Sequence, residues 1–461
     1  MKPFLLLVCL LILASAANAQ THIRISAPKY KGETLILCKY DNYVTKKEKE
    51  LAKCEIDSIG NAYVAVDIDA VQYVFMRYEK LIYYFFVEPD SDINVIFAEK
   101  ELLSEKEKLN PFFEPLYIAA KVTAKNSSNI SLQLLDIDGK SDEIILAVVK
   151  NKKEKDRHFK DSLLNVLKNS LDDYSNEFVN SYAKYRIASI EYLFKLKSVR
   201  DLQYEYFVGK PILYRNPAYC ELFNHINEKY FLHRTQQAQG NVFRQAVNRG
   251  NLSAIRKLLS QNADLQDKDF CDFLILHNAY NEFYDSNFSR SALLSIVDSI
   301  AQETENNDNK ILAEDISNAI VNLLAGYFPP DFELYDMQGN KKSLKSFAGK
   351  YLYLGFFSVN SYGCIQDFYL MKHLAEKFGN KVHFVSICID TKDDIENFIK
   401  TEQYDIDWTF LLCYNNKNII KEYDVRTFPT YYLIDRSGKL LQSPAPSPSE
   451  DIYQIFEKLS D

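Results

Sequence analysis

The side chains best placed for redox chemistry are at residues 361–364, which read Ser-Tyr-Gly-Cys. They follow an apolar stretch, 351–357, that has the pattern of a buried strand, and they open an expected helix from about 362 to 378. A helix N-terminus can lower the pKa of a thiol to ~7 or below, which favours an attacking thiolate. Here Cys364 is the only thiol, because Ser361 takes the position three residues before it. A serine hydroxyl lacks that acidity and cannot form a disulfide, so two-thiol exchange cannot be assumed.

Two interpretations of these residues follow from their types alone. In the first, Ser361 caps the helix by accepting a hydrogen bond from a backbone N–H, and Cys364 is a small, buried and inert residue. In the second, Cys388 serves as a resolving thiol, with Cys413 a weaker candidate. Cys388 lies near the C-terminal end of the expected strand 382–389, at the sheet edge that Cys364 shares if the two strands are parallel neighbours. A disulfide would need Cα atoms within ~7 Å, and Cys388 could equally pack in the core.

The elements around these residues divide the chain into three patterns. Residues 20–98 alternate between apolar and polar positions and contain polar turns, which predicts a small antiparallel β domain. Residues 99–325 carry apolar residues three and four apart, which predicts a mainly helical region. Residues 328–461 alternate between expected strands and helices, which predicts an α/β domain. The fold class is therefore multidomain.

The N-terminus and the composition restrict the protein's location and partners. Residues 1–19 have a positive start, an apolar core and an Ala-Asn-Ala ending, as in a secretory signal peptide, so we expect export to the periplasm or cell envelope. No later stretch is apolar enough to span a membrane. The net charge is −8 and the sequence shows no basic patch, so nucleic acid is not an expected partner. The cysteine and histidine spacings fit no metal motif.

The C-terminal domain resembles the exported TlpA/ResA-like thiol–disulfide oxidoreductases, which have a thioredoxin fold. Three segments carry this resemblance: the opening Pro-Asp-Phe-x-Leu-x-Asp-x-x-Gly at 330–339, Thr-Phe-Pro-Thr at 427–430, and the expected hairpin around 434–438. The resemblance implies that Pro429 is a cis-proline facing the active-site pair. It also places Asp367 where the family often has a carboxylate near the second cysteine.

The departures from the family pattern decide the expected activity. Family sites read Trp-Cys-x-x-Cys-Arg-x-Glu, whereas this chain has Asn360, Ser361 and Ile365 at the Trp, first Cys and Arg positions. The resolving thiol remains and the attacking one is lost.

The peroxiredoxins share the fold and carry Pro-x-x-x-Thr/Ser-x-x-Cys. This pattern would make Cys364 a peroxide-reactive thiol, but Phe357 replaces the proline of the pattern.

The sequence thus favours a redox-degenerate, protein-binding module of the cell envelope. Its expected binding groove lies around Tyr362, Phe428 and Pro429. The alternative is an oxidoreductase that acts on protein disulfides or peroxides through Cys364, resolved by Cys388 or by an external thiol. Partners would be other envelope proteins or their disulfides. No dissociable cofactor is implied, because the electrons would pass through cysteines.

Overall fold

The computed structural model describes residues 20–78, 81–97, 115–124, 129–152, 156–171, 174–321, 323–402, 408–413, 418–425 and 427–459. The expected signal peptide, residues 1–19, lies outside them. The described residues form two compact units, the first ending at Ile316 and the second beginning at Ser317.

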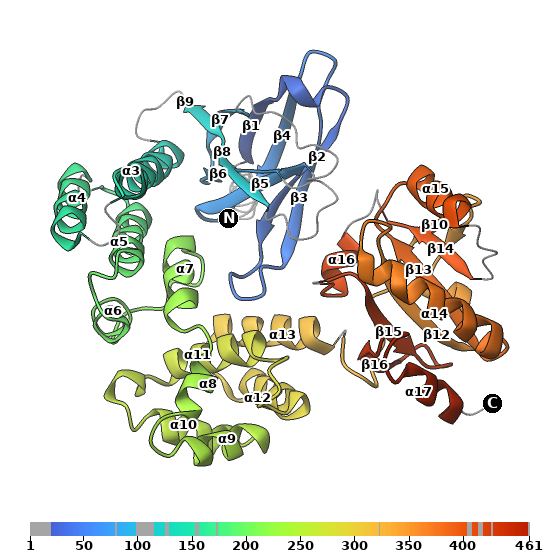
Figure 1. Cartoon of the computed structure of the whole chain (residues 1–461). Helices are drawn as coiled ribbons and strands as arrows, with labels where there is room; N and C mark the ends of the chain where they lie inside the picture. Colours follow the sequence, from blue (N-terminus) through green and yellow to red (C-terminus); the bar gives the residue numbers. More distant parts are fainter. Residues whose placement is uncertain are drawn as a thin grey trace, which may run out of the picture. The chain divides into compact units, whose positions relative to one another are not determined.

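Two β-sheets pack face to face at the start of the first unit (Figure 1). The four-stranded sheet has the order β4 (Asn61–Asp67), β1 (Gln20–Ser26), β7 (Asp92–Ile96), β9 (Lys121–Ala124). The five-stranded sheet has the order β3 (Glu48–Glu55), β2 (Thr34–Tyr40), β5 (Gln72–Tyr78), β6 (Leu81–Val87), β8 (Leu116–Ala119). Alternate side chains of both sheets, such as Ile23 and Met76, form the core between them. Strands β8 and β9 lie beyond residue 98, in the stretch where the sequence predicts mainly helices.

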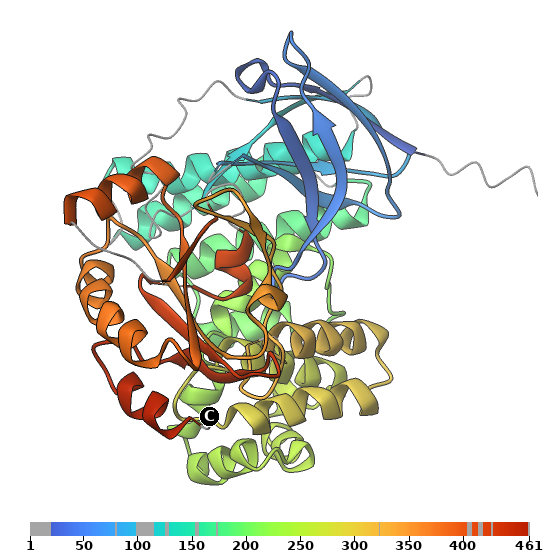
Figure 2. The ribbon, with the colours of Figure 1, turned by 90° about the vertical axis from the view of Figure 1, so that its right-hand side faces the viewer.

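The rest of the first unit is helical (Figures 1 and 2). Its α-helices within the described residues are α3 (Ile130–Lys150), α4 (Arg157–Ser170), α5 (Glu177–Leu193), α6 (Val199–Tyr206), α7 (Pro217–Ile226), α8 (Tyr230–Thr235), α9 (Gly240–Asn248), α10 (Leu252–Leu259), α11 (Lys268–Asn281), α12 (Arg290–Glu303) and α13 (Asn307–Val321). The last turn of α13, from Ser317, belongs to the second unit. Many begin at a side chain that accepts a hydrogen bond from the first turn, as Asn216 does for α7 and Ser289 for α12.

The start of α8 is held by the buried carboxylate of Glu282, the residue that follows α11, and this carboxylate makes the stability of the protein depend on pH. Both oxygens of Glu282 accept hydrogen bonds, from the N–H groups of Phe231 (2.8 Å) and Leu232 (2.9 Å). Burial nevertheless raises the pKa of Glu282 to about 7. A carboxyl with a raised folded-state pKa contributes stability that is complete below its unfolded pKa and is lost as the pH rises through 7.

We therefore expect the free energy of unfolding to fall by roughly 2–3 kcal/mol between pH 4.5 and 8 because of this group. Urea unfolding at several pH values measures the slope. Glu282→Gln removes the titrating group, so the variant's slope should be shallower over this window. Equal slopes in the two proteins would contradict the assignment to Glu282.

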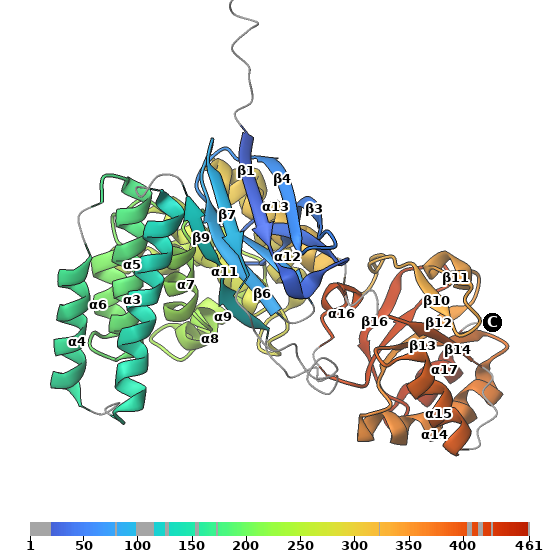
Figure 3. The same ribbon diagram turned by 90° about the horizontal axis from the view of Figure 1, so that it is seen from above.

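The second unit has a seven-stranded sheet with helices on both faces. The strand order is β11 (Lys341–Lys342), β10 (Leu334–Asp336), β14 (Thr409–Leu412), β13 (Val382–Cys388), β12 (Tyr351–Phe357), β15 (Thr430–Ile434), β16 (Leu440–Ala445). Strand β12 runs parallel to β13 and antiparallel to β15. Figure 3 shows helices on one side of the sheet, namely α14 (Tyr362–Phe378), α15 (Lys392–Glu402) and α17 (Ile452–Lys458). Helix α16 (Asn418–Glu422) packs on the other face.

This architecture confirms the predicted fold class: a β-rich start, a helical middle and a C-terminal thioredoxin-like α/β domain. The division of residues 20–325 into separate β and helical domains stays a prediction. Among the helices in the described ranges, none has the length and apolar character needed to cross a membrane.

Candidate functional site

Cys364 lies in the first turn of α14, the helix that follows the interior strand β12, and its side chain is completely buried. Its sulfur accepts a hydrogen bond from the backbone N–H of Ser358 at 3.5 Å. Burial raises the pKa of the Cys364 thiol to about 11, because the hydrogen bonds with Ser358 and Ser361 only partly offset the lost hydration of a thiolate. Cys364 is therefore held as a neutral thiol at physiological pH.

Ser361 stands at the N-cap position of α14, but its hydroxyl does not accept a capping hydrogen bond from a backbone N–H of the helix. It donates instead to the carbonyl oxygen of Phe428, at 2.9 Å. The predicted capping bond is wrong in this detail. Since the residue it contacts is 67 positions away, the hydroxyl ties the helix start to the loop before β15.

The three predicted binding residues lie around this same contact. The Phe428–Pro429 peptide bond is cis, and Pro429 lies against Gly363, where an added Cβ would be 3.2 Å from the proline Cδ. Phe428 and Pro429 are half-buried. Tyr362 is 75% exposed, and its hydroxyl accepts a hydrogen bond from Gln366 one turn later. The loop before β15 and the start of α14 thus present an exposed ring next to a half-buried apolar pair.

Asp367 is one helical turn after Cys364 and is also buried, at 4% exposure. The Tyr431 hydroxyl donates to its Oδ2 at 3.1 Å, and Ser449 also hydrogen-bonds to the carboxyl. Burial raises the pKa of Asp367 in spite of these bonds. A negative charge on Asp367 raises the pKa of Cys364 further, so the carboxylate opposes formation of a thiolate.

Asp390 is a residue of this site that the sequence reasoning missed. It follows β13 and is fully buried beneath the 358–360 loop. Its carboxylate accepts hydrogen bonds from the Ser358 hydroxyl (3.1 Å), the Val359 N–H (2.9 Å) and the Asn360 side-chain amide (3.0 Å). Burial raises its pKa, and its charge also raises the pKa of Cys364. The available signal was its place: it follows a buried parallel strand, at the edge where such sheets bind ligands.

The structure places Cys388 beside Cys364 and leaves Cys413 on another face. Cys388 is aligned with Phe357 in the β12–β13 ladder, and it belongs to the same buried apolar cluster as Cys364. Cys413 donates its backbone N–H to the carbonyl of Cys388 but its side chain packs in the core of the opposite face. All three thiols are unbridged, and burial holds the pKa of Cys388 well above its ordinary value.

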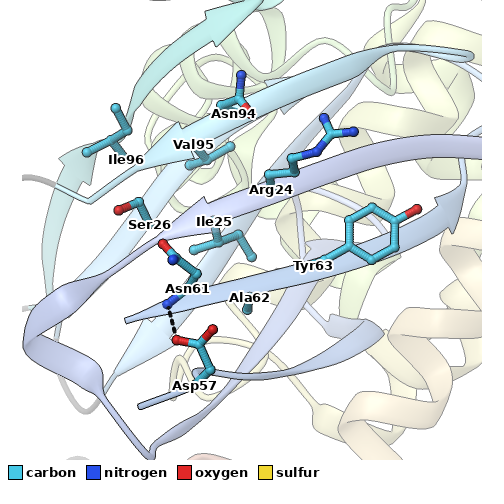
Figure 4. Close-up of a pocket in the computed structure, with 10 residues that line it drawn as sticks. All are labelled: Arg24, Ile25, Ser26, Asp57, Asn61, Ala62, Tyr63, Asn94, Val95 and Ile96. Atoms are coloured by element: carbon cyan, nitrogen blue, oxygen red, sulfur yellow. Dashed lines mark hydrogen bonds between the residues drawn. The ribbon is translucent and has the colours of Figure 1, made fainter. Parts of the chain in front are cut away.

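A surface hollow of about 600 Å³ lies in the first unit and contains none of these residues (Figure 4). It lies on strands β1, β4 and β7, where Arg24 and Tyr63 extend along one side and Asn61 donates its N–H to Asp57. Arg24 already pairs with Asp92. Across the described ranges, no three His, Cys, Asp or Glu side chains are grouped as a metal ion would need.

The comparisons with known proteins concern the C-terminal part of the chain. A family model described as the AhpC/TSA family matches residues 326–443. The thiol-disulfide oxidoreductase ResA of Bacillus thuringiensis subsp. konkukian is 34% identical over 134 residues, which are 28% of this chain and 76% of ResA. The thioredoxin-like protein YneN of Bacillus subtilis is 28% identical over 127 residues, 28% of this chain and 75% of YneN. A solved thioredoxin domain of a thiol-disulfide oxidoreductase from Bacteroides vulgatus is 24% identical, with a TM-score of 0.27, over 30% of this chain and 97% of that one.

Proposed function

The chain belongs, through its C-terminal domain, to the ResA-like thiol–disulfide oxidoreductases, and we propose that it is a redox-degenerate, protein-binding member of them. We place it in the cell envelope, because residues 1–19 have the pattern of a secretory signal. Its partners are other envelope proteins, which it binds at the loop–helix contact around Tyr362, Phe428 and Pro429.

The observation that carries this proposal is the absence of an attacking thiolate at residues 361 and 364. Two-thiol exchange needs an accessible thiolate to attack and a second thiol to resolve the mixed disulfide. In this chain the position at the helix start holds a serine, whose hydroxyl is engaged with Phe428. The remaining thiol, Cys364, is completely buried with a pKa of about 11. Neither residue supplies an attacking thiolate.

The binding half of the proposal rests on the surface that remains. Tyr362 is strongly exposed for an aromatic residue, and the half-buried Phe428 and Pro429 lie against the same helix start. An exposed aromatic ring beside apolar side chains can bury area against a partner at little entropic cost, because tyrosine has few rotatable bonds.

We expect Cys364 to resist a thiol-alkylating probe in the native protein between pH 5 and 9. A thiol with a pKa of about 11 holds ~100-fold less thiolate at pH 7 than one at the ordinary value of 9.0, and burial blocks access as well. Peptide mass mapping after timed alkylation gives the rate for each cysteine. The rate at Cys364 should rise sharply only when urea unfolds the protein.

The same experiment separates this proposal from the alternative activity. A fast native reaction at Cys364, with an apparent pKa well below 8.5, would contradict the proposal. A Cys364→Ser variant identifies the peptide signal and should bind the same partners as the natural chain, since the thiol has no role in binding.

A second candidate function is supported by the shared cluster of Cys364 and Cys388. In it, the protein is an oxidoreductase in which the two thiols form one S–S bond and pass two electrons and two protons to a protein disulfide or a peroxide. An external thiol could replace Cys388 as the resolving group. Mass mapping of the natural chain after mild oxidation would then recover a Cys364–Cys388 disulfide, which the favoured proposal does not produce.

A further inference from the structure

A second hollow of the first unit, about 380 Å³, is lined by tyrosines from the outer face of the five-stranded sheet. Tyr40, Tyr73, Tyr84 and Tyr117 come from β2, β5, β6 and β8, and Tyr43 follows β2. The rings of Tyr73 and Tyr84 are stacked at 5.4 Å, and those of Tyr40 and Tyr73 at 6.3 Å. Because these strands are neighbours or near neighbours, their side chains form a continuous aromatic wall.

Helices α3, α5 and α7 supply the opposite, charged wall. Arg186 of α5 lies 3.0 Å from Asp138 and 3.8 Å from Asp142 of α3, and 3.6 Å from Glu221 of α7. Asp138 also accepts a hydrogen bond from the Tyr182 hydroxyl at 2.7 Å. The side chains of Asp142 and Glu221 are 62% and 53% exposed, so both carboxylates remain open to a ligand entering from solvent.

The charges in this hollow favour a positive ligand over a negative one. Three carboxylates line it against Arg186 and Lys46, a balance of −1 with His225 counted as neutral. Arg186 is surrounded by carboxylates within 4 Å, so an anion would have to displace them before it could pair with the guanidinium. Tyr73 and Tyr84 remain neutral phenols, since burial raises the pKa of both. Neutral aromatic faces attract cations through their quadrupole.

We propose that this tyrosine-lined hollow binds an organic cation, an ammonium or guanidinium group held between the aromatic wall and the carboxylates of Asp142 and Glu221. Two sources have this chemistry: a free amine such as a polyamine, and a lysine or arginine side chain of a polypeptide. The site belongs to the first unit and does not depend on the function proposed for the thioredoxin-like domain.

Ligand-observed NMR titration of the full mature chain tests the proposal with matched probes. Butylammonium should bind about tenfold more tightly than neutral butanol of similar shape, because only the cation gains from the rings and carboxylates. Spermidine and a short lysine-rich peptide then distinguish the two sources, since the tighter ligand identifies the source. Equal binding of butylammonium and butanol, or no binding of any cation at millimolar concentration, would overturn the proposal.

Variants at exposed positions locate the site without risk to the core. Tyr117 is 50% exposed, so Tyr117→Leu should fold and weaken butylammonium binding by about fivefold, whereas Tyr117→Phe keeps the ring and the affinity. Glu221→Gln should weaken binding by a similar factor. Tyr63→Leu, at a 58% exposed tyrosine outside this hollow, is the control and should change nothing. Unchanged affinity in both Tyr117→Leu and Glu221→Gln would show that the cation binds elsewhere and would overturn the assignment.

Discussion

Under the proposed function, replacing Ser361 by cysteine is expected to give this protein a disulfide reductase activity that the natural chain would not have. The new thiol would stand at the N-cap of the 17-residue helix α14, where the partial positive charge of the helix N-terminus stabilises a thiolate. Cys364 lies one turn inside the same helix and is already unbridged, so it can resolve the mixed disulfide.

Reduction of insulin disulfides, with dithiothreitol as the electron source, measures the gain. A thiol with a pKa near 7 is about half thiolate at pH 7, whereas Ser361→Ala has no thiol at this position, so Ser361→Cys should exceed it by about tenfold or more. Ser361→Ala is the matched control because it also loses the bond to Phe428 but gains no thiol. A folded Ser361→Cys protein without activity would mean that the whole site, and not one residue, has decayed.

The same substitution can identify the partner. In a chain carrying both Ser361→Cys and Cys364→Ser, the attacking thiol forms a mixed disulfide that residue 364 can no longer resolve. If the groove around Tyr362 and Pro429 binds a protein that contains an accessible disulfide, that protein should be trapped covalently in the envelope. Adding Tyr362→Ala should reduce the trapped amount, because the ring is exposed at the start of the same helix. Equal trapping with and without Tyr362 would contradict its role in binding.

Much of the C-terminal domain could be predicted because its signals are local. The apolar run of β12, the helix opening at Tyr362 and the strand that ends at Cys388 each follow from a short stretch of sequence. The position of Cys388 beside Cys364 followed from the rule that parallel neighbours share an edge. The chemical identity of the residues at 361 and 364 was readable without any structure.

The contacts that could not be predicted join residues far apart in the chain. The Ser361 hydroxyl donates a hydrogen bond to the carbonyl oxygen of Phe428 and does not cap the helix, because folding brings the loop before β15 within reach. Strands β8 and β9 are four residues each and take their form from pairing with β6 and β7, which a local pattern in residues 99–325 does not reveal. Asp390 looked like an ordinary loop residue because its three partners lie 30 to 32 positions earlier.

Asp390→Ala is expected to destabilise the thioredoxin-like domain by roughly 3 kcal/mol and to loosen the loop that covers Cys364. The substitution leaves the Ser358 hydroxyl, the Val359 N–H and the Asn360 amide without their common acceptor. It also removes a buried charge that raises the pKa of Cys364. Both effects act in the same direction, so native alkylation of Cys364 should become faster while the protein unfolds at lower urea concentration.

Asp435→Ala supplies the matched control for that prediction. Asp435 also accepts three hydrogen bonds, from the N–H and hydroxyl of Ser437 and from the N–H of Lys439, but it lies in the β15–β16 hairpin. Strand β15 is antiparallel to β12, and Ile434 pairs with Leu352 at the start of β12. The hairpin therefore lies at the opposite end of the strands from Cys364, which follows the end of β12. The control should lose stability without any gain in the alkylation rate. If both variants expose Cys364 equally, its reactivity reports general unfolding and Asp390 has no special hold on the site. If only Asp390→Ala exposes Cys364, the buried carboxylate of Asp390 is what keeps the Cys364 thiol unreactive.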